Sequence, residues 1–229
     1  HPHAAVLRDP SDRLDRIEKI LYVEPRGGVS YGDDGTILID DQYAPMGPVI
    51  RKAFEERSWA LPRFLINTHW HQDHTDGNAA FGSDGVVIVA HANVRKRLKA
   101  DQFMAVFDRT VKAQPREGLP VVTFEDAVSF HLNGEHVEVF HVPAAHTDGD
   151  AMVYFPTSNV LHTGDVFFNG FYPLIDVDAG GTAAGMIRAI DTALERITPE
   201  TRIIPGHGLV AGPDTLRAYR AMLVSVASY

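Results

Sequence analysis

Short apolar runs separated by turn residues dominate the pattern of hydrophobic and polar positions along this chain. Runs of this kind, rich in β-branched and aromatic residues and bounded by Gly, Asn, Asp or Pro, are typical of strands. They predict strands at 17–23, 29–31, 36–39, 63–67, 86–90, 121–124, 127–132, 136–142, 151–155, 160–162 and 202–204. Gly32-Asp33-Asp34-Gly35, between the second and third of these runs, predicts a hairpin turn.

Helical patterns appear between the strands. Residues 48–57 and 182–197 predict helices, the second of them amphipathic. The polar–apolar sequence 92–113 predicts a long helix whose apolar part, 103–111, flanks a cleft. Pro213 begins a final helix at a first-turn position that tolerates proline. This order of elements predicts an α/β protein of two mixed halves joined face to face.

Composition narrows the classes of protein. With 229 residues and 45% hydrophobic content the chain can bury one large core but would be cramped as two domains, so we predict a single domain over residues 1–229. A formal charge of −9 disfavours nucleic acid as a partner. No apolar run approaches the roughly 18–20 residues that span a membrane. We therefore expect a small-molecule partner, no nucleic acid and no membrane.

The sequence contains no cysteine, which excludes disulfides, thiolate zinc ligands and a cysteine nucleophile. A chain without disulfides is compatible with both a cytoplasmic and a periplasmic or secreted location. The chain opens with His1-Pro2-His3 rather than Met, so we expect a processed or trimmed form. No Gly-x-Ser-x-Gly elbow is present, which disfavours serine catalysis.

The candidate chemistry is concentrated in Thr68-His69-Trp70-His71-Gln72-Asp73-His74. His69, His71 and Asp73 alternate as they would on an extended segment, where side chains two apart point the same way. His74 directly follows Asp73 and can point elsewhere, so one loop can supply ligands to two neighbouring metals. Imidazole and carboxylate are the ligands that zinc uses when thiolate is absent. The alternative is a surface loop that happens to be rich in His and Asp.

Three further residues of the same chemistry lie beside predicted strands. They are His146 in Ala145-His146-Thr147, Asp165 in Thr163-Gly164-Asp165 and His207 in Pro205-Gly206-His207. A single residue of this kind at a strand end is usually structural. Together with the first run they supply seven potential ligands on four loops, where a rigid scaffold positions functional side chains.

In the order and spacing of these residues the chain resembles the metallo-β-lactamase superfamily, whose signature is His-x-His-x-Asp-His followed by a distant His, Asp and His. The match runs from Asp40 to His207. The resemblance implies a four-layer αββα sandwich with a binuclear zinc centre at one edge of the paired sheets. It implies two Zn²⁺ ions per chain, or other divalent metals.

The resemblance also assigns roles. His69, His71 and His146 would hold the first metal, and Asp73, His74 and His207 the second. Asp165 would bridge the two. Asp40 would orient a ligand imidazole, or would be a turn carboxylate without that role. His162 is a candidate for a supporting position around Asp165.

The implied reaction is hydrolysis by a hydroxide that bridges the metals. Such a centre lowers the pKa of its bound water towards ~7, so the hydroxide is available at neutral pH. Asp73 would orient that hydroxide or shuttle its proton. The substrate would be a small ester, lactone, thioester or amide, with weak β-lactamase activity possible. Trp70, Phe168 and Tyr172 are candidate substrate contacts, although Trp70 could instead pack beneath the site and the aromatic stretch 167–172 could be core packing.

Two other readings of the family stay open. One is a true zinc β-lactamase, which the bridging aspartate and Phe168 disfavour because one major subclass has Cys and Lys at these positions. The other is a mononuclear iron enzyme that resembles persulfide dioxygenases, which the intact second ligand set disfavours. Fold alone does not choose among these activities.

Overall fold

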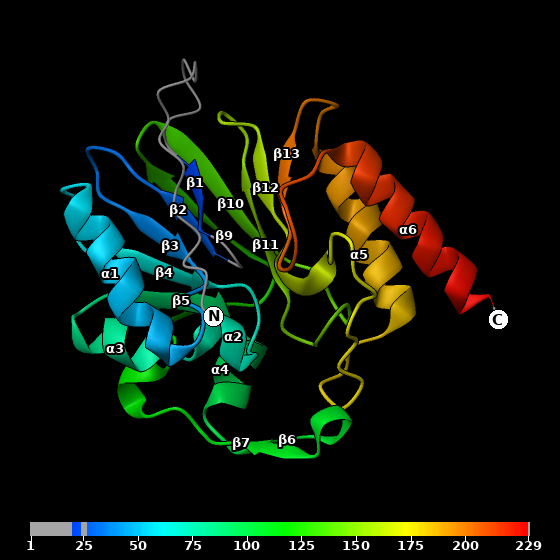
Figure 1. The fold of residues 1–229 in the computed structure, drawn as a ribbon, viewed down its shortest axis with the longest axis horizontal. Helices are drawn as coiled ribbons and strands as arrows, with labels where there is room; N and C mark the ends of the chain where they lie inside the picture. The colour runs from blue at the N-terminus through cyan, green and yellow to red at the C-terminus, as the bar shows by residue number, and fades with distance from the viewer. Residues whose placement is uncertain (1–19, 24–26, 229) are drawn as a thin grey trace, which may run out of the picture.

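In the computed structural model, which describes residues 20–23 and 27–228, two β-sheets lie face to face (Figure 1). Within these residues the first sheet has six strands in the order β1-β2-β3-β4-β5-β8. Its strands are β1 (Ile20–Val23), β2 (Gly27–Ser30), β3 (Ile37–Ile39), β4 (Phe64–Asn67), β5 (Val87–His91) and β8 (Val122–Phe124). β1, β2 and β3 pair antiparallel, and β3, β4, β5 and β8 pair parallel.

The second sheet has the order β13-β12-β11-β10-β9 in the described part of the chain. Its strands are β9 (Ala127–Leu132), β10 (Glu135–His141), β11 (Ala151–Phe155), β12 (Val160–His162) and β13 (Arg202–Ile204). All neighbours pair antiparallel except β12 and β13, which are parallel. Asn133 (φ 57°) and Gly134 (φ 70°) form the turn between β9 and β10, since both residue types tolerate positive φ.

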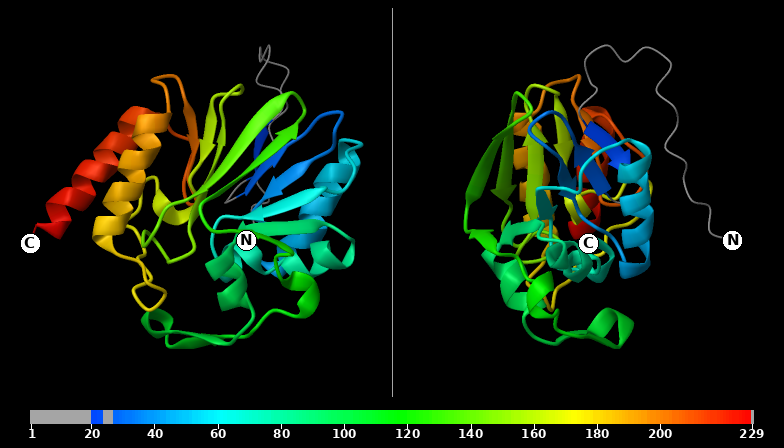
Figure 2. Two further views of the ribbon diagram at one scale, coloured as in Figure 1. Left: turned by 180° about the vertical axis from the view of Figure 1, so that it is seen from behind. Right: turned by 90° about the vertical axis from the view of Figure 1, so that its left-hand side faces the viewer.

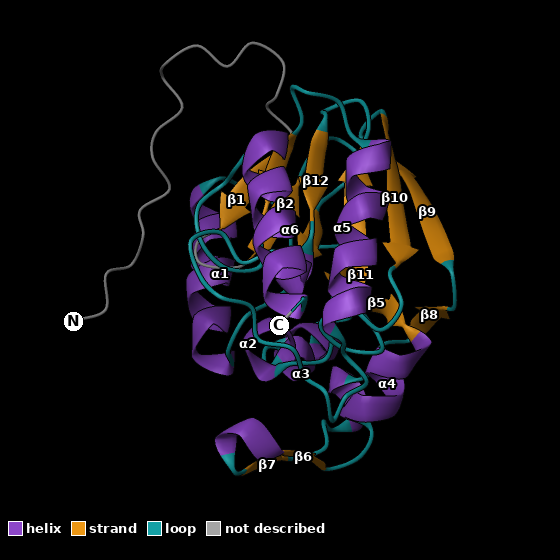
Figure 3. Ribbon diagram, turned by 90° about the vertical axis from the view of Figure 1, so that its right-hand side faces the viewer, coloured by secondary structure: helices purple, strands orange, loops and turns teal. Residues whose placement is uncertain are grey.

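Helices cover the outer faces of both sheets (Figures 1, 2 and 3). The helices are α1 (Gly47–Glu56), α2 (Gln72–Thr75), α3 (Asn78–Ser83), α4 (Ala92–Leu98), α5 (Ala183–Arg196) and α6 (Pro213–Ala227). Short 3₁₀ turns occur at Ala44–Met46, Ala105–Phe107, Arg116–Gly118 and Gly164–Val166. No helix among the described residues is both long and apolar enough to cross a membrane.

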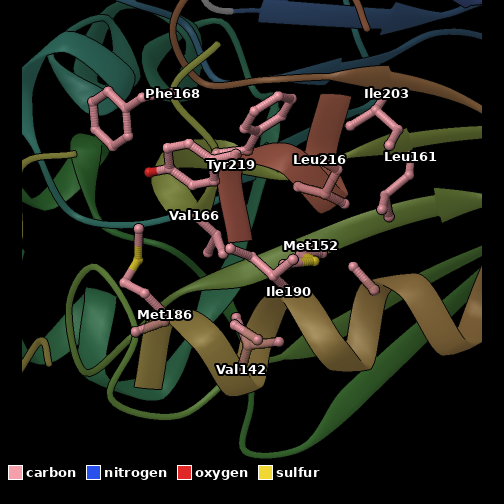
Figure 4. Close-up of a cluster of buried hydrophobic side chains, with 14 of the residues drawn as sticks. Val142, Met152, Leu161, Val166, Phe168, Met186, Ile190, Ile203, Leu216 and Tyr219 are labelled. Carbon is pink, nitrogen blue, oxygen red and sulfur yellow. The ribbon is translucent and has the colours of Figure 1, made fainter. Parts of the chain in front are cut away.

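Alternation along the strands divides the core into layers. In β3, Ile37 and Ile39 pack between the two sheets, whereas Leu38 faces the opposite way and packs with Ile50 and Phe54 of α1. A third cluster fills the space between the second sheet and the helices α5 and α6 (Figure 4). Two sheets between two layers of helices confirm the predicted four-layer αββα sandwich.

The strands and helices predicted from the pattern are confirmed at most positions, with bounds that shift by a residue or so. Of the predicted strand 17–23, residues 17–19 lie outside the described residues. The hairpin turn at 32–35 joins β2 to β3 and is closed by the Gly35 N–H, which donates to the Gly32 carbonyl at 3.0 Å. Thr182 caps α5 by accepting the Gly185 N–H at 2.9 Å.

The long helix predicted over 92–113 is wrong beyond α4. Gln102 Nε2 donates to the carbonyls of Arg97 and Ala100, both at 3.1 Å, and so occupies acceptors at the helix end. The chain then forms an antiparallel hairpin of β6 (Gln102–Met104) and β7 (Arg109–Val111). Asp108 lies in the left-handed region at φ 45° between them. The aromatic and β-branched residues of this segment favour strand pairing, although its pattern of polar and apolar positions resembles that of a helix.

The expectation that His69, His71 and Asp73 share one extended segment is wrong for Asp73. His71 is extended (φ −63°, ψ 149°) and is the residue before α2, so the alternation ends there. Asp73 and His74 lie on the single helical turn of α2, which directs Asp73 away from the side occupied by His69 and His71. Because of this turn, the single segment 69–74 places its potential ligands in two separate groups.

Candidate metal centre

The predicted ligands lie on loops that follow the carboxyl ends of four strands. The 68–74 loop follows β4, His146 follows β10, Asp165 follows β12 and His207 follows β13. These strand ends meet at one edge of the sandwich, beneath which the β6–β7 hairpin projects (Figure 1). The fold therefore gathers residues that are up to 138 positions apart in sequence.

A first cluster consists of His69, His71, His146 and Asp165, whose ligand atoms all lie within 4.8 Å of one another. His146 Nε2 lies 2.9 Å from His71 Nδ1 and 3.6 Å from Asp165 Oδ2. His69 Nε2 lies 3.8 Å from the same carboxylate oxygen. Ligand atoms around a tetrahedral zinc are about 3.4 Å apart, so these separations match a metal site.

A second cluster consists of Asp73, His74 and His207, again within 4.8 Å. Asp73 Oδ2 lies 3.6 Å from both His74 Nε2 and His207 Nε2. Asp165 lies between the clusters, because its Oδ1 is 3.1 Å from His74 Nε2 and its Oδ2 is 3.1 Å from His207 Nε2. The structure thus brings all seven predicted ligands together, with Asp165 in contact with both groups.

Asp40 fixes the two histidines at the start and end of the 69–74 run. Its Oδ2 accepts the His74 Nδ1–H at 2.8 Å and the Thr68 hydroxyl at 2.7 Å. Because that hydroxyl donates to Asp40, it accepts the proton of His69 Nδ1 at 3.1 Å. Both imidazoles consequently turn Nε2 toward the centre. Of the two roles considered for Asp40, the orienting one fits this geometry.

His71 and His146 are oriented in the same manner. His71 Nε2–H donates to Asp176 Oδ2 at 2.9 Å, and His146 Nδ1–H donates to the Leu174 carbonyl at 2.7 Å. Lone pairs on His71 Nδ1 and His146 Nε2 therefore face each other at 2.9 Å, an arrangement that a cation between them makes favourable. Asp176 was missed by the sequence reasoning because it is 105 residues from its partner and follows no strand.

Buried polar atoms test whether a metal fits. His69 Nε2, His74 Nε2 and Asp165 Oδ1 are buried, and none of them makes a well-oriented hydrogen bond within the described part of the chain, although His74 Nε2 lies 3.1 Å from Asp165 Oδ1. An unsatisfied buried polar atom costs roughly 1–3 kcal/mol, and all three point into the space between the clusters. Nitrogen and carboxylate donors of this kind are the set that binds zinc and similar divalent metals. The residues therefore fit a metal centre.

Burial and neighbouring charges perturb the centre's ionisation. Burial and the adjacent His71 lower the pKa of His146 to about 4, and burial and His74 hold the pKa of His69 well below its usual value. Burial also acts to lower the pKa of His74, but the carboxylates of Asp165, Asp73 and Asp40 outweigh it and raise this pKa well above 6.5.

Asp165 is ionised despite its burial. Burial acts to raise its pKa, and the imidazoles of His74 and His69 outweigh that effect and hold the pKa well below the ordinary value of 3.8. A buried, ionised carboxylate beside imidazole nitrogens is a ligand set that favours a cation.

Gly206 allows the loops of Asp165 and His207 to approach closely. A Cβ at this position would collide with Oδ1 of Asp165 and with the backbone of Gly164. The Gly206 N–H also donates to the Gly164 carbonyl at 2.8 Å. The absence of a side chain at Gly206 therefore permits the short separation between Asp165 and His207.

A cavity of about 290 Å³ opens onto the centre. His71, Asp73, Asp165 and His207 line it on the side of the candidate ligands. The other lining residues are Tyr43, Gln72, Met104, Phe107, Arg109, Phe168 and Leu174. Phe107 and Arg109 belong to the segment 103–111, which the sequence predicts to flank a cleft, but they do so from a hairpin rather than from a helix. The cavity is near the lower end of the roughly 300–1,000 Å³ typical of small-ligand pockets.

The other candidate residues fall at different distances from this cavity. Phe168 lines it and stacks on His207, with ring centroids 4.9 Å apart and 6° between the planes. Trp70 is 2% exposed and packs with Val94 and Leu98, so its position supports packing beneath the site. Tyr172 is 80% exposed and lines a neighbouring apolar hollow. His162 accepts the Gly164 N–H at 3.2 Å and so supports the turn before Asp165.

The αββα sandwich and the His and Asp side chains gathered at its edge define a protein with a candidate metal centre. The chain belongs to the metallo-beta-lactamase superfamily, whose family model matches residues 29–207.

Curated relatives are hydroxyacylglutathione hydrolases. The protein of that name from Brucella ovis is 29% identical over 193 residues, covering 83% of this chain and 65% of its own length. The one from Brucella anthropi is 29% identical over 153 residues, covering 66% of this chain and 51% of its own length. The chain thus spans between about half and two thirds of the length of these relatives.

Solved structures of similar fold are metallo-beta-lactamases. DIM-1 metallo-beta-lactamase superposes with a TM-score of 0.70 at 18% identity, covering 87% of this chain and 86% of that one. The enzyme from Pontibacter korlensis gives a TM-score of 0.70 at 21% identity, covering 86% of each chain. At these identities the likeness establishes the fold alone.

Proposed function

We propose that this protein is a zinc-dependent hydrolase of a small ester, lactone, thioester or amide, with a thioester as the first candidate. The observation that carries the proposal is the convergence of seven imidazole and carboxylate side chains. Three of their inward-facing atoms, His69 Nε2, His74 Nε2 and Asp165 Oδ1, are buried without a well-oriented hydrogen bond among the described residues. Such a set has no structural purpose without a cation, because leaving these atoms unpaired destabilises the fold.

Two zinc ions per chain would occupy the clusters. His69, His71 and His146 would hold the first, Asp73, His74 and His207 the second, and Asp165 both. When bound, such a metal pair supplies an acidified water at neutral pH and polarises the substrate carbonyl.

The protein's own residues supply positioning and proton transfer. Asp73 is the ligand residue with an 18% exposed side chain that lines the cavity, so its carboxylate can hold the attacking water and accept its proton. Asp40 and Asp176 keep His74 and His71 in the orientation that presents a lone pair to the centre. Phe168 and Leu174 give the cavity an apolar wall that excludes water from the acyl group.

The relatives favour the thioester. Their name describes hydrolysis of a hydroxyacyl group carried by glutathione, which is a thioester. The two oxygens of Asp165 reach both clusters, which supports a centre that holds two metals.

The test combines metal content with turnover. The wild-type protein, reconstituted with zinc and dialysed, is expected to hold about two zinc ions per chain and to hydrolyse at least one thioester in a panel of thioesters, esters, lactones, amides and β-lactams. Asp165→Ala is expected to lower the zinc content and to reduce kcat/KM by more than about 100-fold, the scale of a first ligand's contribution. Its circular-dichroism spectrum should remain that of the wild type.

Asp214→Ala is a matched control, because Asp214 is an exposed carboxylate on α6 that pairs only with Arg217 among the described residues. It should retain metal and activity. Two zinc ions and full activity in Asp165→Ala would refute the role of Asp165 at both metals. One iron per chain with oxygen uptake on a persulfide substrate, or turnover confined to β-lactams, would replace the proposal with one of the other activities of the family.

A further inference from the structure

Arg109 is the one Arg or Lys among the described residues that line the cavity above the centre. It lies on β7 directly opposite Met104 of β6, and both side chains line the cavity. Its guanidinium donates to Gln72 Oε1 at 2.6 Å. Gln72 lies between His71 and Asp73 in the sequence, so the positive charge is held one residue from two candidate ligands.

Arg109 forms no ion pair among the residues that the structure describes. The partner of Arg109 is a neutral amide, and no described Asp or Glu oxygen lies within 4.0 Å of its nitrogens. Other arginines differ, since Arg97 binds both oxygens of Asp148 and Arg220 both oxygens of Asp191. Arg109 therefore keeps its donors and its charge for a group that enters the cavity.

The surroundings suit an amphipathic guest. Phe107 and Tyr43, 56% and 42% exposed, line the cavity with Met104 and Phe168 and offer contacts to an aliphatic chain. The carboxylates that also face the cavity, Asp73 and Asp165, belong to the proposed metal clusters. On a chain with a formal charge of −9, a fixed cation at the cavity wall is a local exception that would attract an anion.

The hairpin that carries Arg109 is also held by a second hydrogen bond, at the turn between β6 and β7. The Ala105 N–H donates to Asp178 Oδ2 at 3.3 Å, on the same loop as Asp176. With the Gln72 bond, this contact holds the hairpin between the two loops that surround the centre. The guanidinium is thus presented from a fixed support, as a specificity contact requires.

We propose that Arg109 is a carboxylate anchor, and that the enzyme selects small acyl substrates bearing a carboxylate a few bonds from the scissile carbonyl. The inference rests on the proposed function and names its substrate class. A guanidinium is suited to this task because its planar donors bind a carboxylate through two parallel hydrogen bonds. Arg109 is a binding residue in this account and takes no part in bond cleavage.

The test compares two substrates that differ only in the anchored group. Mono-4-nitrophenyl glutarate and 4-nitrophenyl valerate have the same acyl chain, ending in a carboxylate or a methyl group. Initial rates, corrected for uncatalysed hydrolysis, are measured with the zinc-loaded wild type, Arg109→Ala, Arg109→Lys and Lys112→Ala. Lys112 is the matched control, because it follows the same strand but pairs with Asp101 at 2.7 Å and does not line the cavity.

The expected result is a selective loss. In Arg109→Ala, kcat/KM for the glutarate ester should fall about 10- to 100-fold, the effect of hydrogen bonds to a charged group. The loss should lie mainly in KM, since the anchor binds ground state and transition state alike. The valerate ester should change by less than about threefold. Arg109→Lys should be intermediate because it retains charge without the planar fork, and Lys112→Ala should match the wild type.

An equal fall for both esters in Arg109→Ala would overturn the anchor and show that the Gln72 bond only supports the hairpin. An unchanged rate for the glutarate ester would overturn it as well. If the wild type hydrolyses neither ester nor any member of the panel, the proposed function fails instead. The anchor is then decided by saturation-transfer NMR with glutaramate and valeramide: a glutaramate signal lost in Arg109→Ala supports it, and equal signals in both proteins reject it.

Discussion

Each of the four buried imidazoles in this centre turns one nitrogen inward and gives its other N–H to a protein acceptor. The acceptors differ: Asp40 for His74, the Thr68 hydroxyl for His69, Asp176 for His71 and a backbone carbonyl for His146. These outer contacts select the tautomer and hold the ring plane, which in metal sites commonly contributes 10- to 100-fold to affinity.

Asp176→Asn tests the role of these outer hydrogen bonds at the carboxylate acceptor that sequence reasoning missed. The amide keeps the size of the side chain but loses the charge that stabilises the His71 Nε2–H, so zinc affinity is expected to fall about 10- to 100-fold. Zinc competition against a chromophoric chelator measures the change. Asp178→Asn, two residues along the same loop, contacts Ala105 of the hairpin instead and should leave affinity unchanged. Equal affinities for wild type and Asp176→Asn would contradict the orienting role.

The seven ligands could be predicted from sequence because their density and spacing are themselves the signal. Asp176 and Arg109 could not, since their roles depend on contacts 105 and 37 residues away that only the fold creates. Trp70 is a residue whose position in the sequence is misleading. It lies between two ligands, which favours a place in the cleft, but its ring is buried in a core cluster.

At the scale of elements, α6 completes the outer layer of the second sheet although it lies beyond residues 29–207. Leu216 of α6 is 1% exposed and packs in the cluster that includes Ile190 of α5 and Phe167 of the loop after Asp165 (Figure 4). This helix therefore supports the loop that carries a proposed ligand.

Leu216→Ala is expected to lower the free energy of unfolding by about 2–5 kcal/mol, the usual cost of a cavity in place of a buried leucine. Urea unfolding of the metal-free protein measures it. Val224→Ala, on the same helix but 42% exposed, should change stability by no more than about 0.5 kcal/mol. A similarly small effect at Leu216 would show that α6 is not part of the cooperative core.

Elements with a strong period were predictable, such as the strands of both sheets and the amphipathic α5. The segment 99–113 was not, because a mixture of polar and apolar residues fits a helix and a twisted hairpin equally well. The Gln102 side chain at the helix end and the left-handed Asp108 decide between them, and both are tertiary or turn effects. Because the sequence does not predict this hairpin, it does not predict the position of Arg109 in the cavity either.

For the whole molecule, burial of the centre predicts an unusual pH dependence once metal is removed. The pKa of His74 is raised by its neighbouring carboxylates, so its stabilising contribution is complete below pH 6.5 and is lost as pH rises through the folded-state pKa. Burial raises the pKa of Asp150 to about 7 and that of Asp41 well above 3.8. A folded state that retains these protons also loses stability as pH rises.

We therefore expect the metal-free protein, in the presence of a chelator, to become less stable from pH 6.5 to 9 in urea unfolding. Zinc should stabilise it more strongly at the upper end of this range, because metal ligands must be deprotonated. His74→Gln should flatten the profile of the metal-free protein. Stability that rises with pH in the metal-free protein would contradict the assigned protonation of the centre.

The central claim is that the seven side chains hold two metals with Asp165 in contact with both. Crystals of zinc-loaded protein, measured on both sides of the zinc absorption edge, test it most directly. We expect two anomalous peaks a few ångströms apart, one among His69, His71 and His146 and one among Asp73, His74 and His207, with the Asp165 carboxylate between them. A single peak, or no peak at this edge of the sandwich, would contradict it.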